Sequence, residues 1–552
     1  MIQRTFDIFN EAEFSWILSS LKDARLYGSQ GRVFMQLCFS RFTSVEAQKI
    51  LDYIHSELPH IQVVGMSLYG DALVHLNTTK MLRVNISEFS ESEVRIFEYD
   101  AHEMNEDEIC SKFRAQLASI LDAKGVMVLA SGLTFNISRF MENVTQGYEE
   151  IPFFGTQANL NTADTEFLKP FVATTRLISA GIVVTVFSGA NLYFHVKSVF
   201  GWKPIGMPLA VETSEVPCGI GDTLITRIAG KPAADIYRQY LNVRPDRYFI
   251  SNICEFPLAL ERNGMIMARV PCGVTKNGEL NAMGNIKNGE TVRFTYGKTD
   301  EILRQSWEAS AEMAQFYPQG MFLYVCANRA IFMKDRAHEE IEYFGKIVPG
   351  TVYCHGFSEL FRYKGQGGVF NSTLIAVGVR EGEAHVDSPD ISRLPQGLFK
   401  SPEWNEAHTT AKEANTEAAE NSCDSFSPDS VERHSMFESP IGVSIPIADR
   451  LVTFLEAVTE ELRNATVAAN AASDAKSAFL SSMSHEIRSP INAVLGLDEM
   501  ILRESTEPQI KGYARDIQSS GRSLLSIIND ILDFSKIEAG KMEIINDDYD
   551  LR

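Results

Sequence analysis

His485 and Glu486 are the residues of this chain best placed to do chemistry, because they stand side by side in the segment FLSSMSHEIRSPI at positions 479–491. An imidazole titrates near neutral pH, so its neutral form can act as a nucleophile or as a proton acceptor. A carboxylate beside it raises its basicity. Without further context, such a pair on a polar helix face is more often a solvated surface pair. The residues around it must therefore show whether it is a reactive pair.

Two amphipathic helices are expected to present this pair. At about 100° per residue, residues 480–501 form a helix with one apolar stripe, and His485, Ser489 and Asn492 lie on roughly the opposite face. A second helix is predicted over residues 510–537. The two stripes consist of Leu480, Met483, Ile487, Ile491, Val494 and Ile501, and of Ile510, Tyr513, Ile517, Leu524, Ile528, Ile531 and Leu532.

The residues at the ends of these helices predict a hairpin. Thr506 can cap the second helix, Pro508 sits in its first turn, and Gly540 ends it. Pro490 lacks an amide proton and is expected to bend the first helix just after His485. One antiparallel hairpin leaves its apolar stripe half covered, so two copies are expected to complete a four-helix bundle in a homodimer.

This segment resembles the HisKA domain, the dimerisation and histidine-phosphotransfer domain of sensor histidine kinases, whose usual sequence is close to FLANMSHEIRTPLN. The resemblance continues through Asn492–Gly496 and Ile531–Gly540. It implies that His485 is the phosphoacceptor and that Glu486 takes or orients its proton. Ser489 stands where the family usually has threonine, a position that helps to place water in the phosphatase reaction. ATP with Mg would supply the phosphoryl group, and an aspartate on a response regulator receiver domain would accept it.

The sequence ends at Tyr549–Arg552, in the segment that normally leads into the ATP-binding domain of such kinases. It contains no Asn-rich box, no Asp-x-Gly-x-Gly lid and no P-loop, and the cluster Gly365–Gly368 is better explained as a hairpin turn. We therefore expect a sensor histidine protein kinase that is inactive alone. The chain would be a fragment of a longer kinase, or an acceptor served by another ATP-binding catalytic domain in trans.

Residues 1–385 alternate strand-like and helix-like segments, which favours a mixed α/β region. The segments are Val33–Phe39, a helix ending near His55, Ile61–Met66, Val126–Leu129 and Ser138–Thr145. Motifs follow in an order that resembles the FIST sensory domain, a cytosolic input module of prokaryotic signalling proteins. They are Gly65, Ser67, Gly70 and Asp71, then Gly201–Gly206, then Gly230–Tyr237, and for the second half Cys326–Arg329, Glu339, Glu340 and Asn371–Thr373.

The FIST resemblance implies that this region binds a small molecule, amino-acid-like ligands being one proposal for the family. Arg329 could hold a carboxylate through two hydrogen bonds and Trp202 could line a pocket, or Arg329 could pair with an internal acid and Trp202 pack in a core. Some family members bind haem, for which His195 and His355 are candidates, although satisfied core or surface histidines are favoured. Glu359 is displaced from the glutamate position of the family, which leaves its role open.

Composition narrows the classes of partner and compartment. The net charge of −21 argues against nucleic acid and anionic membrane surfaces. The 8 cysteines form no CxxC pair, which favours reduced thiols in the cytoplasm, and the adjacent Cys354 and His355 are expected to be structural. The N-terminus lacks the pattern of a signal peptide. Residues 177–196 carry no charged side chain, but Ser188–Asn191 interrupts them as a turn, so they predict a buried β-hairpin rather than a membrane span.

A polar linker separates the two regions, because periodicity fades over residues 386–446 and Ser, Glu, Asn, Pro and Ala dominate. A heptad pattern then predicts a parallel two-stranded coiled coil over residues 447–478, with a lone amphipathic core helix as the alternative. Its seam leads directly into Phe479 and Met483. The heptad positions are Leu451, Leu455, Val458, Leu462, Ala465, Ala469 and Ala472.

The predicted fold class is therefore multidomain, a mixed α/β FIST region followed by an all-α coiled coil and a helical hairpin that forms a dimeric four-helix bundle. The expected domains are FIST N at 1–240, FIST C at 241–385, a flexible linker at 386–446, a signalling helix at 447–478 and HisKA at 479–545, with 546–552 leading towards an ATP-binding domain. We expect ligand binding to the FIST region to control phosphorylation of His485. The alternative is a dimeric adaptor that binds a ligand, haem or nitric oxide included, without phosphotransfer.

Overall fold

The structure is a computed structural model, and it describes residues 1–9, 13–14, 31–68, 80–131, 135–158, 170–214, 223–245, 249–253, 255–262, 264–383 and 447–538. The chain divides into two compact units, an N-terminal unit of Met1–Thr453 and a C-terminal unit of Phe454–Arg552. The predicted linker at 386–446 and the predicted last segment at 546–552 lie outside the described residues, as do Gly70, Asp71 and Gly540.

The first sheet of the N-terminal unit has the strand order β1-β4-β2-β3-β8-β9. Helix α2 (Ser44–Glu57) connects the parallel strands β2 and β3 and buries Ala47, Leu51 and Ile54 among residues of the sheet. A capping box of Thr43 and Glu46 begins this helix. The strands are β1 (Ile2–Ile8), β2 (Val33–Ser40), β3 (Gln62–Ser67), β4 (Met81–Glu88), β8 (Val172–Ala173) and β9 (Leu177–Ile178). The predicted succession of strand, helix and strand over residues 33–66 is confirmed.

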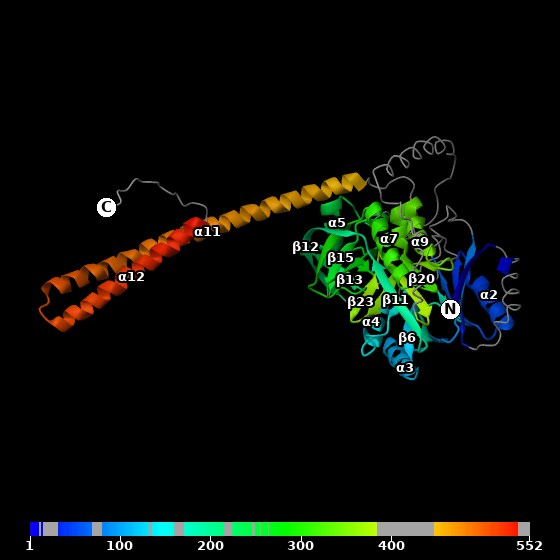
Figure 1. Cartoon of the computed structure of the whole chain (residues 1–552). Helices are drawn as coiled ribbons and strands as arrows, with labels where there is room; N and C mark the ends of the chain where they lie inside the picture. Colours follow the sequence, from blue (N-terminus) through cyan, green and yellow to red (C-terminus); the bar gives the residue numbers. More distant parts are fainter. Residues whose placement is uncertain are drawn as a thin grey trace, which may run out of the picture. The chain divides into compact units, whose positions relative to one another are not determined.

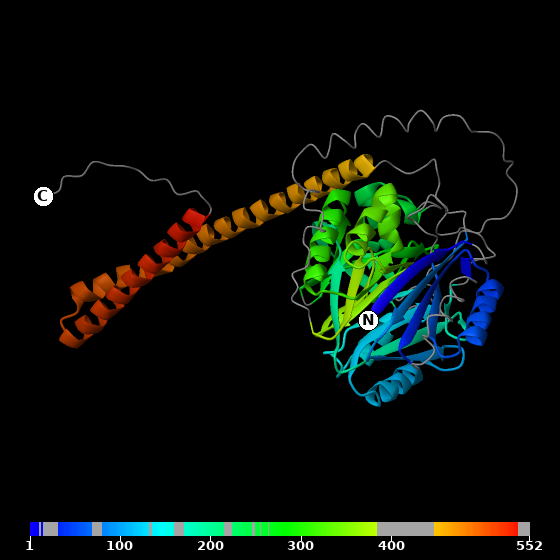
Figure 2. The ribbon, with the colours of Figure 1, turned by 45° about the vertical axis from the view of Figure 1, so that its right-hand side comes forward.

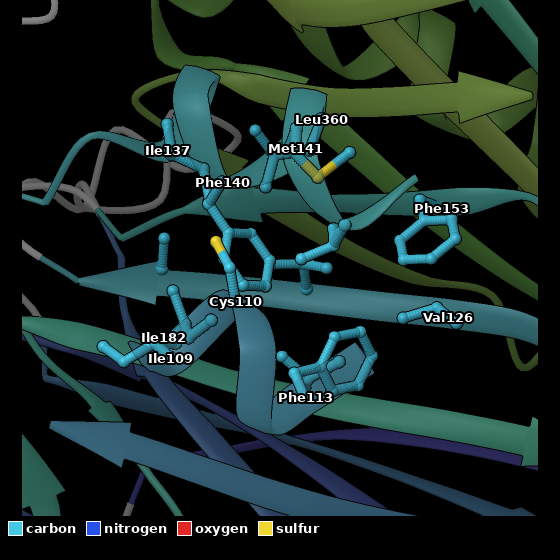
Figure 3. Close-up of a cluster of buried hydrophobic side chains, with 14 of the residues drawn as sticks. Ile109, Cys110, Phe113, Val126, Ile137, Phe140, Met141, Phe153, Ile182 and Leu360 are labelled. Atoms are coloured by element: carbon cyan, nitrogen blue, oxygen red, sulfur yellow. The ribbon is translucent and has the colours of Figure 1, made fainter. Parts of the chain in front are cut away.

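A second sheet, ordered β23-β22-β7-β6-β10-β5, is covered by helices α3 (Glu106–Ala118) and α4 (Ile137–Val144). Figure 3 shows Phe113 of α3 and Phe140 of α4 in one apolar cluster, which Leu360 of β22 also joins. The strands are β5 (Glu93–Asp100), β6 (Ala123–Ser131), β7 (Phe153–Gln157), β10 (Gly181–Ser188), β22 (Glu359–Tyr363) and β23 (Gln366–Phe370). The strand and helix predicted around residues 126–145 are therefore confirmed.

The third sheet has the order β11-β24-β20-β21 and packs against α7 (Thr299–Gln315), α8 (Ala327–Met333) and α9 (Ala337–Gly345). Its strands are β11 (Leu192–Val199), β20 (Gly320–Cys326), β21 (Val352–Gly356) and β24 (Leu374–Glu381). A fourth sheet has the order β16-β15-β19-β12-β13-β18-β17, with β14 beside β13. Helix α5 (Ala233–Leu241) contacts β13 of this sheet (Figure 1), and α6 (Phe249–Ile253) contacts β17. Its strands are β12 (Lys203–Ser214), β13 (Thr223–Ile228), β14 (Lys231–Pro232), β15 (Leu258–Arg262), β16 (Met265–Arg269), β17 (Pro271–Val274), β18 (Leu280–Ala282) and β19 (Thr291–Tyr296).

The two halves of the N-terminal unit exchange strands. Strand β11, from the first half of the sequence, pairs with β24 in the third sheet. Strand β22, from the second half, pairs with β7 in the second sheet. Neither half can complete its sheets alone, which explains why residues 1–453 form one compact unit.

The uncharged stretch at residues 177–196 forms strands but not the predicted hairpin. Strand β10 pairs with β5 and β6 in the second sheet, whereas β11 pairs with β24 in the third. The turn at Gly189–Asn191 therefore moves the chain from one sheet to another, and the hairpin prediction is wrong. The hairpin predicted at the glycine cluster is confirmed, because β22 and β23 pair across Lys364 and Gly365, whose φ angles are 52° and 73°. No helix among the described residues combines the length and the apolar character that a bilayer crossing requires.

The C-terminal region is a helical hairpin of α11 (Ile447–Glu504) and α12 (Pro508–Glu538). In both ribbon views α12 folds back along the C-terminal half of α11 (Figures 1 and 2). The predicted signalling helix and the first HisKA helix are one uninterrupted helix, which continues through Pro490. The prediction that Thr506 caps the second helix is wrong. Helix α12 begins at Pro508, so the capping position before it is occupied by Glu507. The backbone amide of Glu507 donates a hydrogen bond to Ser505 Oγ at 3.3 Å.

Candidate phosphoacceptor site

His485 lies on α11 with its side chain exposed, and its ring makes no hydrogen bond or ion pair with any described residue. The preceding Ser484 is buried, whereas Glu486 is exposed. This alternation follows from the helical period, which turns consecutive side chains by about 100°. The helix therefore packs at Ser484 and presents His485 and Glu486 together to solvent.

Ser489 stands one turn after His485 and is tied to its backbone. The Ser489 hydroxyl donates to the His485 carbonyl oxygen at 3.1 Å, an i−4 contact that serine often makes inside helices. Pro490 follows and has no N–H to donate to the carbonyl of Glu486, so this turn has one backbone hydrogen bond fewer than its neighbours. The hydroxyl of Ser489 keeps its acceptor lone pairs for a water molecule.

Contacts on the side of α11 next to His485 hold α12 in place. The Arg488 guanidinium donates to the Asn529 side chain at 3.0 Å. Gly521 allows close approach, because a Cβ atom there would lie 2.8 Å from Cδ2 of Leu495. Ala514 of α12 is buried. These contacts fix the face of α11 that packs inside the hairpin and thereby the face that carries His485.

A broad apolar face of the hairpin remains exposed in the single chain. The sequence predicted a half-covered stripe, and none of its members is fully buried. The sequence reasoning missed several further exposed side chains, namely Leu497, Met500, Ile527, Phe534 and Ile537. A face of this kind is unusual for a monomeric soluble protein and is typical of a protein interface.

Asp498 is a residue that the sequence reasoning overlooked. Its side chain is 2% exposed, and neither carboxylate oxygen has a hydrogen-bond partner among the described residues. A carboxylate is rarely left in such surroundings without compensation. The signal was present in the sequence, since Asp498 falls one turn after Val494 and Leu495 in an otherwise apolar stretch.

In the N-terminal unit, Arg329 is fully buried and paired internally. Its guanidinium contacts the Glu340 carboxylate at 2.6 Å and the Ser306 hydroxyl at 3.3 Å. It also donates to the carbonyl oxygens of Val199, Phe200 and Ser372. All of its donors are used, which is the internal ion pair that the sequence left open as the alternative to a ligand contact.

Trp202 and Arg329 do come together. The guanidinium carbon of Arg329 lies 5.4 Å from the Trp202 ring centroid, within cation–π range. Trp202 is 3% exposed and packs against Phe200 and Phe332 at centroid distances of 5.6 and 5.3 Å. Trp202 therefore packs in the core beside the third sheet, with Arg329 next to its ring. The Nε1 atom of Trp202 has no hydrogen-bond partner among the described residues.

The two candidate haem histidines lie on opposite edges of the third sheet. His195 is on β11 and His355 on β21, with β24 and β20 between them. Three strand spacings separate the edges by roughly 14 Å, so the two rings do not fit the two axial positions of one haem. Burial and the nearby Lys197 lower the pKa of His195, whose ring stacks on Phe316 at 5.5 Å.

Glu359 and Cys354 are both buried at strand positions. Burial raises the pKa of the Glu359 carboxyl well above its usual range, although the Cys326 thiol and the Thr373 amide beside it oppose this. The Cys354 thiol lies 3.1 Å from the Cys38 thiol and accepts a hydrogen bond from Gln36 Nε2 at 3.2 Å. The sequence did not reveal this thiol pair, because its members are far apart along the chain.

Comparison with protein families matches three domains in succession. The FIST N domain matches residues 34–220, the FIST C domain residues 233–360, and the His Kinase A (phospho-acceptor) domain residues 475–540. The last match contains His485, Glu486 and Ser489. Both family resemblances seen in the sequence are therefore confirmed.

Curated proteins match short stretches of the chain. The Non-motile and phage-resistance protein of Caulobacter vibrioides is 54% identical over 82 residues, which cover 14% of this chain and 10% of that protein. Probable histidine kinase 6 of Oryza sativa is 50% identical over 84 residues, 15% of this chain and 9% of that protein. Cell-division control histidine kinase PdhS of Brucella ovis is 42% identical over 99 residues, 17% of this chain and 10% of that protein.

The chain thus matches only about 10% of the length of these relatives. The exposed histidine lies inside the matched phosphoacceptor domain, and the interleaved sheets of the N-terminal unit carry both FIST matches. The chain has FIST N, FIST C and HisKA domains in that order, and this is the domain order of a FIST-containing sensor histidine kinase.

Proposed function

We propose that this chain is the input and phosphoacceptor part of a sensor histidine kinase, and that His485 carries the phosphoryl group. The supporting observation is the exposure of His485 on a helix that matches the phosphoacceptor domain and that packs against α12 through neighbouring side chains such as Arg488. The phosphoryl donor is ATP, held by an ATP-binding catalytic domain. Ligand sensing in the FIST region sets how readily His485 is phosphorylated.

The proposed chemistry has two phosphoryl transfers. The neutral imidazole nitrogen of His485 attacks the γ-phosphorus of ATP, an N–P bond forms, and the bond from phosphorus to the bridging oxygen of ADP breaks. Glu486 takes the proton that the other ring nitrogen releases. A receiver-domain aspartate oxygen then attacks the phosphorus, the N–P bond breaks, and the imidazole is regenerated. In the opposing phosphatase reaction, a water oxygen attacks the phosphorus of the aspartyl phosphate, the bond from the aspartate oxygen to phosphorus breaks, and inorganic phosphate leaves. Ser489 is placed to hold that water molecule through its hydroxyl.

The first test uses the full chain with radiolabelled ATP and a separately purified ATP-binding domain of a histidine kinase. Wild type should acquire an acid-labile label, His485→Gln should acquire none, and Glu486→Gln should be labelled about 10²–10⁴ times more slowly. The control is His102→Gln, which removes an exposed histidine of the N-terminal unit and should leave labelling unchanged. Absence of label on wild type, with an ATP-binding domain that labels its own acceptor, would favour the dimeric adaptor instead.

We also propose that the active form is a homodimer, because a second hairpin would cover the exposed apolar face that includes Leu524 and Ile531. Sedimentation velocity of the full chain should give a dimer for wild type and a monomer for Leu524→Asp combined with Ile531→Asp. Ser519→Asp, an exposed control that points about 140° away from Leu524 on the same helix, should remain dimeric. A monomeric wild type at micromolar concentration would contradict the bundle.

The sensed ligand is proposed to be a small molecule bound by the N-terminal unit, to which the FIST matches point. A thermal-shift screen of amino acids and related carboxylates tests this, and a Soret band in the purified protein would indicate haem instead. We propose a cytoplasmic location, which the free thiols of Cys38, Cys110, Cys326 and Cys354 support. Localisation of a tagged full chain by fractionation is the corresponding measurement.

A further inference from the structure

The first two turns of α11 belong to the N-terminal unit, and Arg450 is one side chain that binds them there. The N-terminal unit extends to Thr453, whereas α11 begins at Ile447. Arg450, in between, is 1% exposed although it lies near the start of a long helix. Its guanidinium donates to the backbone carbonyl of Asn252 and pairs with the Glu255 carboxylate.

The surface that receives Arg450 is formed by the end of α6 and the residues after it. The Asn252 carbonyl lies in the last turn of α6, where carbonyl groups lack helical donors. The guanidinium carbon also lies 5.4 Å from the ring centroid of Phe256, which is fully buried. The arginine thus meets a carboxylate, a free carbonyl and an aromatic face, three groups that each favour a cation.

This contact is less complete than the buried contact of Arg329 in the same unit. All donors of Arg329 find acceptors, whereas Nε of Arg450 is buried without a partner among the described residues. Glu255 is also 21% exposed, so water can solvate it when the arginine leaves. Separating an ion pair that has one unsatisfied donor and one solvent-accessible partner costs less free energy than separating a fully buried pair whose donors are all satisfied.

Arg450 and His485 lie on the same uninterrupted helix. Helix α11 contains both residues, and its proline, Pro490, comes only after His485. At a rise of 1.5 Å per residue, Arg450 lies roughly 50 Å from His485 along the helix axis. A continuous helix transmits rotation and translation from one end to the other because its backbone hydrogen bonds resist twisting.

We propose that the Arg450–Glu255 contact is the joint through which the N-terminal unit controls His485, closed in one signalling state and open in the other. This inference rests on the proposed phosphotransfer function and adds its point of regulation. Opening the joint frees the first turns of α11 to change their rotation, and the change reaches the face that carries His485.

The test is a charge exchange in the full chain, with the initial rate of His485 labelling as readout. Arg450→Glu and Glu255→Arg should each change the rate about 5-fold or more in the same direction. The double variant restores the pair with reversed polarity and should return the rate to within about 2-fold of wild type. Arg238→Glu, which disturbs the exposed pair with Asp235, is the matched control and should have no effect.

Hydrogen exchange at residues 447–453 gives a second readout that needs no catalysis. Each single variant should speed exchange in these first turns, and the double variant should slow it again. Unchanged labelling rates in the single variants would overturn the proposal. A change that the double variant does not reverse would also overturn it, because that would reflect damage to the fold. If wild type takes no label at all, the phosphotransfer function fails, and hydrogen exchange alone then decides whether the contact holds the helix.

Discussion

Arg329 and Glu340 form a sealed ion pair in the N-terminal unit, 2.6 Å apart, with side chains that are 0% and 1% exposed. The pair joins α8 to α9 and, through the carbonyl oxygens of Val199 and Phe200, to the end of β11. It therefore connects a strand from the first half of the sequence to helices from the second half.

Breaking this pair should destabilise the N-terminal unit strongly. Glu340→Gln leaves the Arg329 charge buried without its counter-ion, and we expect the free energy of unfolding to fall by about 3–5 kcal/mol. The double variant Arg329→Met, Glu340→Met should lose less, because it buries no charge. Urea unfolding followed by tryptophan fluorescence measures both. A smaller loss in the single variant than in the double would contradict this view of the pair.

The thiols of Cys38 and Cys354 should be chemically inert in the folded protein. Both are buried, and the hydrogen bond with Cys38 together with burial raises the pKa of the Cys354 thiol well above its usual range. Alkylation by iodoacetamide should be more than about 100-fold slower in the native protein than in urea, since it requires local opening. Mass spectrometry of the peptides gives the rates. Val45→Cys, at an exposed position of α2, should react rapidly as a control.

The stability contribution of Glu381 should depend on pH. Burial opposes the ionised form, but amide donors of Ser90 and Ser92 at 2.7 and 2.8 Å outweigh it and lower the pKa of Glu381 to about 2. Because the folded-state pKa lies below the unfolded value of 4.5, the stabilisation is fully present above about pH 4.5 and is lost as the pH falls towards about 2.

Glu381→Gln should therefore cost about 2–3 kcal/mol of unfolding free energy at pH 7. The difference from wild type should shrink at pH 4 and shrink further at pH 3. Denaturant titrations at the three pH values test this. A difference that stays constant with pH would show that the effect of the substitution is purely steric.

Replacing Asp498 should stabilise the helical hairpin. Its carboxylate is buried without a partner among the described residues, so Asp498→Leu should raise the free energy of unfolding by about 1–3 kcal/mol. Asp516→Leu, at an exposed position of α12, should change it by less than about 0.5 kcal/mol. Thermal unfolding followed by circular dichroism compares the variants. Destabilisation by Asp498→Leu would mean that a second copy supplies the missing partner.

The sequence alone determined what depends on local order. The helical periods around His485, the exposed side that this residue occupies, the turn at Gly365 and the short strands and helices near residues 33–66 all follow from neighbouring residues, because hydrogen bonds and apolar spacing within a few turns decide them. The sequence also carried enough ordered motifs to identify the FIST and HisKA families.

The tertiary structure alone decided which distant segments meet. The stretch at residues 177–196 looked like a hairpin because turn signals do not reveal strand partners, yet β10 and β11 enter different sheets. Contacts between separate segments of the chain also decided which partners three side chains have. Arg329 pairs with Glu340, the Cys354 thiol lies beside that of Cys38, and Arg450 pairs with Glu255. Such pairings are set by how whole sheets and helices cover one another's apolar faces, a global packing problem that no local pattern encodes.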